Sequence, residues 1–142
     1  MTVRDAMCDH PRCVPGHTEI IDAARLMATL NVGSLPICAD DRLVGIVTDR
    51  DITTRFVAHE ARHRHISAIM THDPVTIAPD ESLEHAQRVM AQYQLRRLPV
   101  CDDDGHVVGI LSQADIARHA TREDTGALLE AISAPRAGVR TD

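Results

Sequence analysis

Two stretches of the chain carry nearly the same phrase: GIVTDRDI at Gly45–Ile52 and GILSQADI at Gly109–Ile116. Each contains a glycine, two aliphatic residues, a hydroxyl residue, two variable positions and then an aspartate. Such a phrase, repeated within 142 residues, indicates an internal duplication. Repeats constrain the fold more strongly than any local signal does.

The similarity extends outward from this phrase. Residues 3–41 align with residues 66–104 at an offset of 63, and one extra residue near Gly105 raises the offset to 64. We therefore interpret the chain as a tandem duplication with units at 3–58 and 66–121. The matched pairs include Met7 and Met70, Pro11 and Pro74, Met27 and Met90, LPIC (Leu35–Cys38) and LPVC (Leu98–Cys101), and Asp51 and Asp115.

Each unit shows the same order of expected elements. A turn that ends in Met precedes a short extended piece, an amphipathic helix, two short strands and a closing helix, which gives β-α-β-β-α. The extended pieces lie at Cys13 and Val75, and Thr18 and Asp80 are the expected N-caps. The expected apolar helix faces are Ile20, Ala23, Ala24 and Met27, and Leu83, Ala86, Met90 and Tyr93; the later strands are 43–47 and 107–111, and the closing helices are 49–57 and 113–120.

Three short strands and two helices bury too little apolar surface to be stable alone. We therefore predict an α/β (α+β) fold in which the two units pack face to face around a pseudo-twofold axis. The predicted division is a first domain at 1–62, a second at 63–122, and a tail at 123–142 with a short helix at 127–132.

The composition limits the classes of function. The formal net charge is −6 and aromatic residues are almost absent, so the core must be aliphatic. Nucleic-acid binding needs a clustered basic face, and no apolar run has the length of a membrane span. The first residues lack the apolar stretch of a secretory signal. We expect a cytoplasmic protein with no nucleic-acid or membrane partner.

The hydroxyl residue and the aspartate of the repeated phrase lie where a strand ends and a helix begins. Thr48 with Asp51, and Ser112 with Asp115, would offer a hydroxyl, backbone amides and a carboxylate at one place. A carboxylate accepts two hydrogen bonds and suits a ribose diol, so one interpretation is a pair of nucleotide sites. The alternative is that these residues only cap the helices and complement their dipoles.

The repeated unit resembles the cystathionine β-synthase (CBS) domain, and the tandem resembles a CBS pair, or Bateman module, over residues 1–121. GIVTDRD and GILSQAD fit the G-h-h-[TS]-x-x-D signature of the family, while SLPIC, RLPVC, DAM and AIM fit its second strand and opening turn. The resemblance implies a non-catalytic regulatory module that binds AMP, ADP or ATP and needs no cofactor. It also implies a homodimer through the helices at 49–57 and 113–120.

The resemblance further implies two clefts, each shared between the units. One cleft would be formed by Ile46, Thr48, Asp51, Thr76, Ile77, Arg96, Arg97 and Leu98. The other would be formed by Cys13, Val14, Gly33, Ser34, Leu35, Ile110, Ser112 and Asp115.

The two implied clefts differ in charge. Guanidinium groups bind phosphate in a fork, so Arg96 and Arg97 lead us to expect the nucleotide in the cleft of Asp51. The cleft of Asp115 has Gly33 and Ser34 at the matching places and is expected to be weak or empty. The alternative places both arginines on a solvated loop or at a helix end.

The cysteines and histidines allow other chemistry. Neighbouring strands of a β-α-β unit could bring Cys13 and Cys38 into a disulfide, although a reducing cytosol favours free thiols. His59 and His63 of the linker would share a helix face, as two metal ligands can. Since no complete ligand set is visible, we predict no metal site and interpret the linker as solvated.

No catalytic triad order, glycine-rich phosphate loop or acid/base carboxylate pair is apparent, so we predict no enzyme. Three functions stay open. The first, which we take as the main prediction, is an adenine-nucleotide sensor that signals through a dimer or a separate protein partner. The others are a redox- or zinc-responsive protein and a ligand-free interaction scaffold.

Overall fold

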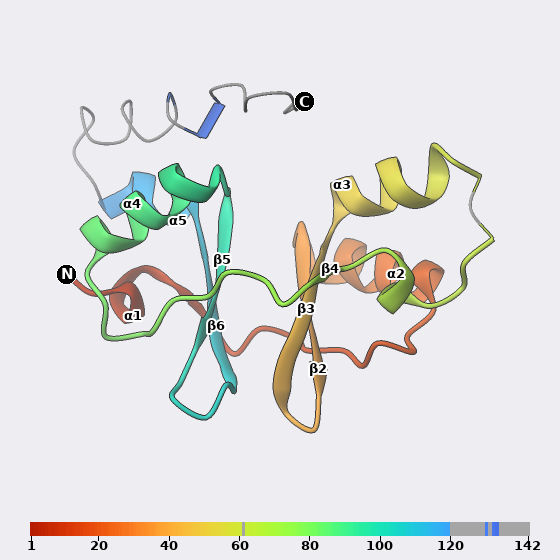
Figure 1. Cartoon of the computed structure of the whole chain (residues 1–142), viewed down its shortest axis with the longest axis horizontal. Coiled ribbons are helices and arrows are strands. Elements are labelled where there is room, and N and C mark those ends of the chain that lie inside the picture. Colours follow the sequence, from red (N-terminus) through yellow and green to blue (C-terminus); the bar gives the residue numbers. More distant parts are fainter. Residues whose placement is uncertain (61, 120–129, 131, 134–142) are drawn as a thin grey trace.

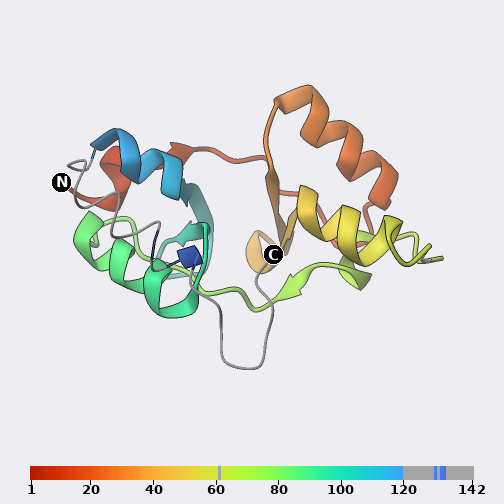
Figure 2. The same ribbon diagram turned by 90° about the horizontal axis from the view of Figure 1, so that it is seen from above.

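The computed structural model describes residues 1–60, 62–119, 130, 132 and 133, which form two lobes (Figure 1). Each lobe has one three-stranded sheet, with the sheets toward the middle and the helices outside (Figure 2). The predicted α/β class is confirmed. The elements are α1 (Val3–Ala6), β1 (Cys8–Asp9), α2 (Ile20–Leu30), β2 (Ser34–Ala39), β3 (Arg42–Thr48), α3 (Asp49–Asp51), η1 (Ile52–Val57), η2 (Ile66–Ala68), β4 (Thr71–His72), α4 (Leu83–Tyr93), β5 (Arg97–Cys101), β6 (Val107–Ser112) and α5 (Gln113–His119).

An antiparallel hairpin forms the main part of each sheet, β2–β3 in one lobe and β5–β6 in the other. The register pairs Leu35 with Val47 and Leu98 with Leu111. All four side chains are buried, as expected for strands that cover a core with one face. Each hairpin also contains one register shift just before its cysteine, so even the irregularity is duplicated.

The third strand of each sheet is exchanged between the units. β4 lies near the start of the second unit but pairs with β3 of the first, and β1, near the start of the first unit, pairs with β6 of the second. A β-carbon on Gly45 would lie 2.9 Å from the Thr71 carbonyl oxygen, and one on Gly109 would lie 3.0 Å from that of Cys8. The glycine of the repeated phrase is therefore required because the exchanged strand lies directly against it.

Each lobe has its own aliphatic core, and the exchange supplies part of it. Val3 and Ala6 of α1 are buried with the second unit, whereas Ile66 and Ile69 are buried with the first. Most of the predicted tail lies outside the described residues, but Ile132 packs in the second core. The first residues of each unit therefore belong to that unit in sequence but pack in the core of the other unit.

The helices α2 and α4 bury the predicted residues except Ala24, which is half-buried, and Tyr93. Tyr93 is 46% exposed, because α4 ends there and the next residue, Gln94, is left-handed. The predicted N-caps were wrong by one or two positions. Ser82, not Asp80, caps α4 by accepting the His85 amide at 3.0 Å, and α2 follows Glu19 rather than Thr18.

The closing helices differ from each other. α3 is α-helical for a single turn and continues as the π-helix η1, whereas α5 is α-helical through His119. The last residue predicted for α5, at 120, lies outside the described residues. Where the hairpin turns of the two lobes meet, the Leu43 amide donates to the Gly105 carbonyl at 3.1 Å. None of the helices in the described segments has the length and apolarity needed to cross a bilayer.

Candidate functional site

A cavity of about 1190 Å³ lies between the two units. Its walls come from the segment Cys8–Cys13, the end of α2 with the start of β2, the start of α3, the residues before β5, and the end of β6 with the start of α5. Segments far apart in sequence therefore meet here because the two units pack against each other.

Ser112 and Asp115 form the end of the cavity at β6 and α5. The Ser112 amide donates to Asp115 Oδ2 at 2.8 Å, and the Asp115 amide donates to Ser112 Oγ at 3.1 Å. This reciprocal arrangement is a capping box, so Ser112 and Asp115 cap the start of α5. It also fixes the carboxylate and the hydroxyl in one orientation at the cavity wall.

The Asp115 carboxylate is almost fully buried, with 3% of the residue exposed. Its Oδ1 forms an ion pair with Arg118 and accepts a weak hydrogen bond from the Cys8 thiol at 3.9 Å. Burial and the adjacent Asp115 charge raise the pKa of Cys8 above its usual value. The buried charge is thus balanced by protein groups.

Arg96 and Arg97 also line this cavity, whereas the sequence-based hypothesis gave them to the cleft of Asp51. The physical reason is the register of the second hairpin, which pairs Arg97 with Ser112. The Gln113 amide also donates to the Arg96 carbonyl at 2.9 Å. The residues before LPVC therefore lie beside the hydroxyl residue of their own unit.

The set expected for the second cleft is brought together almost completely. Gly33, Ser34, Leu35, Ile110, Ser112 and Asp115 all line the cavity, as does Cys13. Val14 does not, because its side chain is buried in the first core. The cleft that was expected to be weak is therefore the one that has the large cavity and the arginines.

The set expected for the first cleft is divided. Thr48 and Asp51 form the same capping box, at 2.9 and 3.1 Å, and Asp51 Oδ1 lies 3.6 Å from Arg55 Nε. Neither residue lines the large cavity. Thr76 and Ile77 line a separate cavity of about 400 Å³. Leu98 is fully buried in the second core and Ile46 is half-buried in β3.

Sequence comparison identifies the origin of this architecture. A model of the CBS domain family matches the chain twice, at residues 3–58 and 66–122. The chain belongs to the CBS domain family. The predicted resemblance, including the tandem arrangement, is confirmed, and the described lobes are the two members of a CBS pair.

Two curated relatives match this CBS pair over nearly their whole length. The CBS domain-containing protein YhcV of Bacillus subtilis is 37% identical over 134 residues, covering 93% of this chain and 95% of its own. Hypoxic response protein 1 of Mycobacterium tuberculosis is 35% identical over 139 residues, covering 96% of each chain.

Solved structures of CBS pairs superimpose on this one. The CBS pair of protein MJ0100 in complex with 5′-methylthioadenosine and S-adenosyl-L-methionine has a TM-score of 0.77 and 32% identity, covering 84% of this chain and 98% of its own. CBSX2 in complex with AMP has a TM-score of 0.74 and 30% identity, covering 83% and 94%. Hypoxic response protein 1 with two coordinated zinc ions has a TM-score of 0.75 and 35% identity, covering 85% and 100%.

The CBS pair also brings three cysteines near one another. All four cysteines are free thiols, so the Cys13–Cys38 disulfide considered as a possibility from the sequence is not formed in this structure. The two thiols are nevertheless adjacent, because the Val14–Ile37 bridge joins their strands. Burial, followed by the hydrogen bond with Cys13, raises the pKa of Cys38 to about 12, and burial with the nearby Asp102 raises that of Cys101 to about 11.

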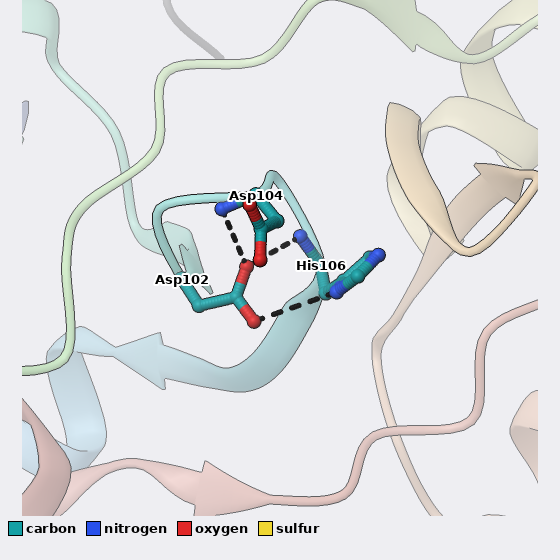
Figure 3. A group of neighbouring side chains, drawn as sticks. All are labelled: Asp102, Asp104 and His106. Atoms are coloured by element: carbon teal, nitrogen blue, oxygen red, sulfur yellow. Dashed lines mark hydrogen bonds and ion pairs between the residues drawn. The ribbon is translucent and has the colours of Figure 1, made fainter.

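One side-chain group was missed by sequence reasoning. Asp102, Asp104 and His106, on the turn between β5 and β6, offer possible metal-ligand atoms within 4.8 Å of one another (Figure 3). Asp102 Oδ1 accepts the amides of Asp104 and His106 at 3.0 and 2.9 Å, and these bonds hold the pKa of Asp102 below its usual value. Hydrogen bonds of this kind are those of an Asx turn and account for the arrangement without an ion.

Proposed function

We propose that this CBS pair is a non-catalytic regulatory module that binds an adenine nucleotide in the large cavity. Proteins of the same fold bind AMP in one case and 5′-methylthioadenosine with S-adenosyl-L-methionine in another. All three ligands contain adenosine, so the shared chemistry is an adenine base on a ribose. The proposal places that ligand beside Asp115 rather than beside Asp51.

The observation that carries the proposal is the coincidence of three chemical groups at one cavity. Asp115 offers carboxylate oxygens for a ribose diol, Ser112 offers a hydroxyl, and Arg96 and Arg97 offer guanidinium groups for phosphate. Carboxylate oxygens have more acceptor positions than the three hydrogen bonds and ion pairs of Asp115 use. Of about four acceptor positions, one is therefore open on Oδ2, and the second hydroxyl of a diol would replace the weak Cys8 thiol hydrogen bond on Oδ1. A diol bound in this way leaves the capping box intact.

The test compares two equivalent aspartates. Isothermal titration of AMP, ADP and ATP into wild type, Asp115→Asn and Asp51→Asn should show affinity reduced about tenfold or more only for Asp115→Asn, as for a lost charged hydrogen bond. Asp51→Asn is the matched control, because it alters the same capping box away from the cavity. Weaker binding only in the Asp51 variant would show that the nucleotide binds beside Asp51 and not beside Asp115. Absence of binding by the wild type would refute the proposal.

We further propose that the output passes through self-association or a separate protein partner. The outward helices α3–η1 and α5 are the expected dimer surface. Light scattering coupled to size-exclusion chromatography, with and without ATP, measures this directly. A mass that stays at 15.6 kDa in both conditions would rule out signalling through a homodimer.

A second candidate function, redox sensing, is favoured by the adjacency of Cys13 and Cys38. Cys13 lines the cavity, so a disulfide with Cys38 would alter a cavity wall. An added small-molecule disulfide would oxidise the Cys13 and Cys38 thiols to this disulfide and would itself be reduced to two thiols. Mass spectrometry after alkylation without reductant should then find two blocked cysteines, whereas four alkylated cysteines would exclude the pair. A thermal-shift assay with added zinc, which hypoxic response protein 1 coordinates in its solved structure, tests the zinc-responsive alternative, because a ligand that binds the native state raises the melting temperature.

A further inference from the structure

The large cavity gathers more positive charge than the proposed function has used so far. Arg12 and Arg50 reach it from the first unit, and Arg96 and Arg97 reach it from the second. The acidic residues that line it are Asp9, Asp49 and Asp115. Because Asp115 is already paired with Arg118, four guanidinium groups face two uncompensated carboxylates, in a chain whose formal net charge is −6.

Within the described residues, no carboxylate forms an ion pair with any of these four arginines. Five other arginines, namely Arg4, Arg25, Arg55, Arg64 and Arg118, form ion pairs. No ion pair within the described part of the chain includes Arg12, Arg50, Arg96 or Arg97. Among the described arginines outside the cavity, five form ion pairs and three, Arg42, Arg62 and Arg88, do not, whereas none of the four in the cavity forms one.

One of these arginines, Arg97, also reaches across the boundary between the units. A β-carbon built on Gly33 would lie 2.5 Å from Arg97 Nη2 and 3.4 Å from Asp49 Oδ2. Arg97 of the second unit thus lies over the backbone of the first, close to the start of α3, where Arg50 follows Asp49. A side chain at position 33 would displace this guanidinium group from its present position.

Resting on the proposed function, we propose that this cavity binds a chain of at least two phosphates, and that Arg12 and Arg50 select nucleoside di- and triphosphates over the monophosphate. Guanidinium groups bind phosphate oxygens in pairs, so Arg96 and Arg97 suffice for one phosphate. Two further arginines, Arg12 and Arg50, line the same cavity from the first unit and match a second or third phosphate. The volume of about 1190 Å³ exceeds the usual ~300–1,000 Å³ of a small-molecule site, which leaves room for the longer chain.

The experiment measures the dissociation constants of AMP, ADP, ATP and inorganic tripolyphosphate by titration calorimetry in magnesium-free buffer, so that no cation shields the phosphates. Wild type should bind ATP at least tenfold more tightly than AMP, because the additional phosphates of ATP would form at least one more charge-assisted hydrogen bond. The double variant Arg12→Ala/Arg50→Ala should lose this preference and keep its AMP affinity. Arg88→Ala, which removes one exposed arginine of α4 outside the cavity, is the matched control and should change nothing.

The outcomes separate this inference from the proposed function. Equal affinities of wild type for AMP and ATP would overturn the inference and leave nucleotide binding intact, as would equal losses of AMP and ATP affinity in the double variant. If no adenine nucleotide bound, the proposed function would fail. In that case, tripolyphosphate binding that is lost in the double variant and kept in Arg88→Ala would still support the polyphosphate site. If tripolyphosphate did not bind either, the inference would fail together with the proposed function.

Discussion

The two copies of the repeated phrase have the same local structure and different surroundings. Thr48–Asp51 and Ser112–Asp115 form the same capping box, with equivalent distances within 0.1 Å. Ser112 and Asp115 line the large cavity together with Arg96 and Arg97, whereas the first copy contributes Asp49 and Arg50 but not its capping pair, Thr48 and Asp51. The comparison teaches that the phrase encodes a helix start, whereas the surroundings decide whether its capping pair also lines a cavity.

The largest expected effect tests what the two copies share. Gly45→Ala and Gly109→Ala should each destabilise the fold by about 3 kcal/mol, since overpacking against a fixed backbone costs roughly 1–3 kcal/mol and the new methyl groups would meet backbone oxygens at 2.9 and 3.0 Å. Urea unfolding measures both. Gly105→Ala is the control, because its β-carbon would meet nothing closer than 4.0 Å; only its positive φ would add strain. A tolerated alanine at Gly45 or Gly109 would contradict the proposed reason for the glycine.

A smaller effect should distinguish the copies. Asp115→Ala removes a buried cap that also pairs with Arg118, and Asp51→Ala removes a more exposed one whose side chain is 15% accessible. Loss of a cap costs roughly 0.5–2 kcal/mol, so we expect about 2 kcal/mol at Asp115 and about 1 kcal/mol at Asp51. Equal changes in the free energy of unfolding would show that the surroundings of Asp115 add nothing to its cap.

The smallest effect concerns the matched cysteines Cys38 and Cys101. Their pKa values of about 12 and 11 exceed the ordinary 9.0, so the folded state holds these thiol protons more tightly than the unfolded state. By linkage, their contribution to stability is fully present below about pH 9 and is lost as the pH rises toward 11–12. Between pH 8 and 11, the melting temperature of wild type should fall more steeply than that of Cys38→Ala. Parallel slopes would contradict the buried-thiol assignment.

Most of the fold could be predicted from the sequence, because duplication makes each unit a check on the other. The apolar period located α2 and α4, and the LP strands and their hairpins followed from turn chemistry. The caps were misplaced because Thr18, Asp80 and Ser82 are all suitable residue types, and only backbone geometry selects among them. The exchange of β1 and β4 was missed, since strand pairing between distant segments leaves no local signal.

The site was predicted less well than the fold, for a reason visible in the second hairpin. Residues of the Asp115 cleft were named almost completely, yet Arg96 and Arg97 were given to the wrong neighbour because hairpin register was not considered. Arg12 and Arg50 were not singled out at all. Each is an ordinary exposed arginine in its own segment, and only the packing of the two units reveals that they share a cavity.

The exchange of β1 and β4 has a consequence for how this molecule can be divided. A fragment cut at the linker would carry one hairpin together with the edge strand that belongs to the other hairpin. Each half would then present an unpaired sheet edge and an incomplete core, and both defects are repaired only when the complementary half is present. Separately expressed halves should therefore assemble with each other rather than behave as independent domains.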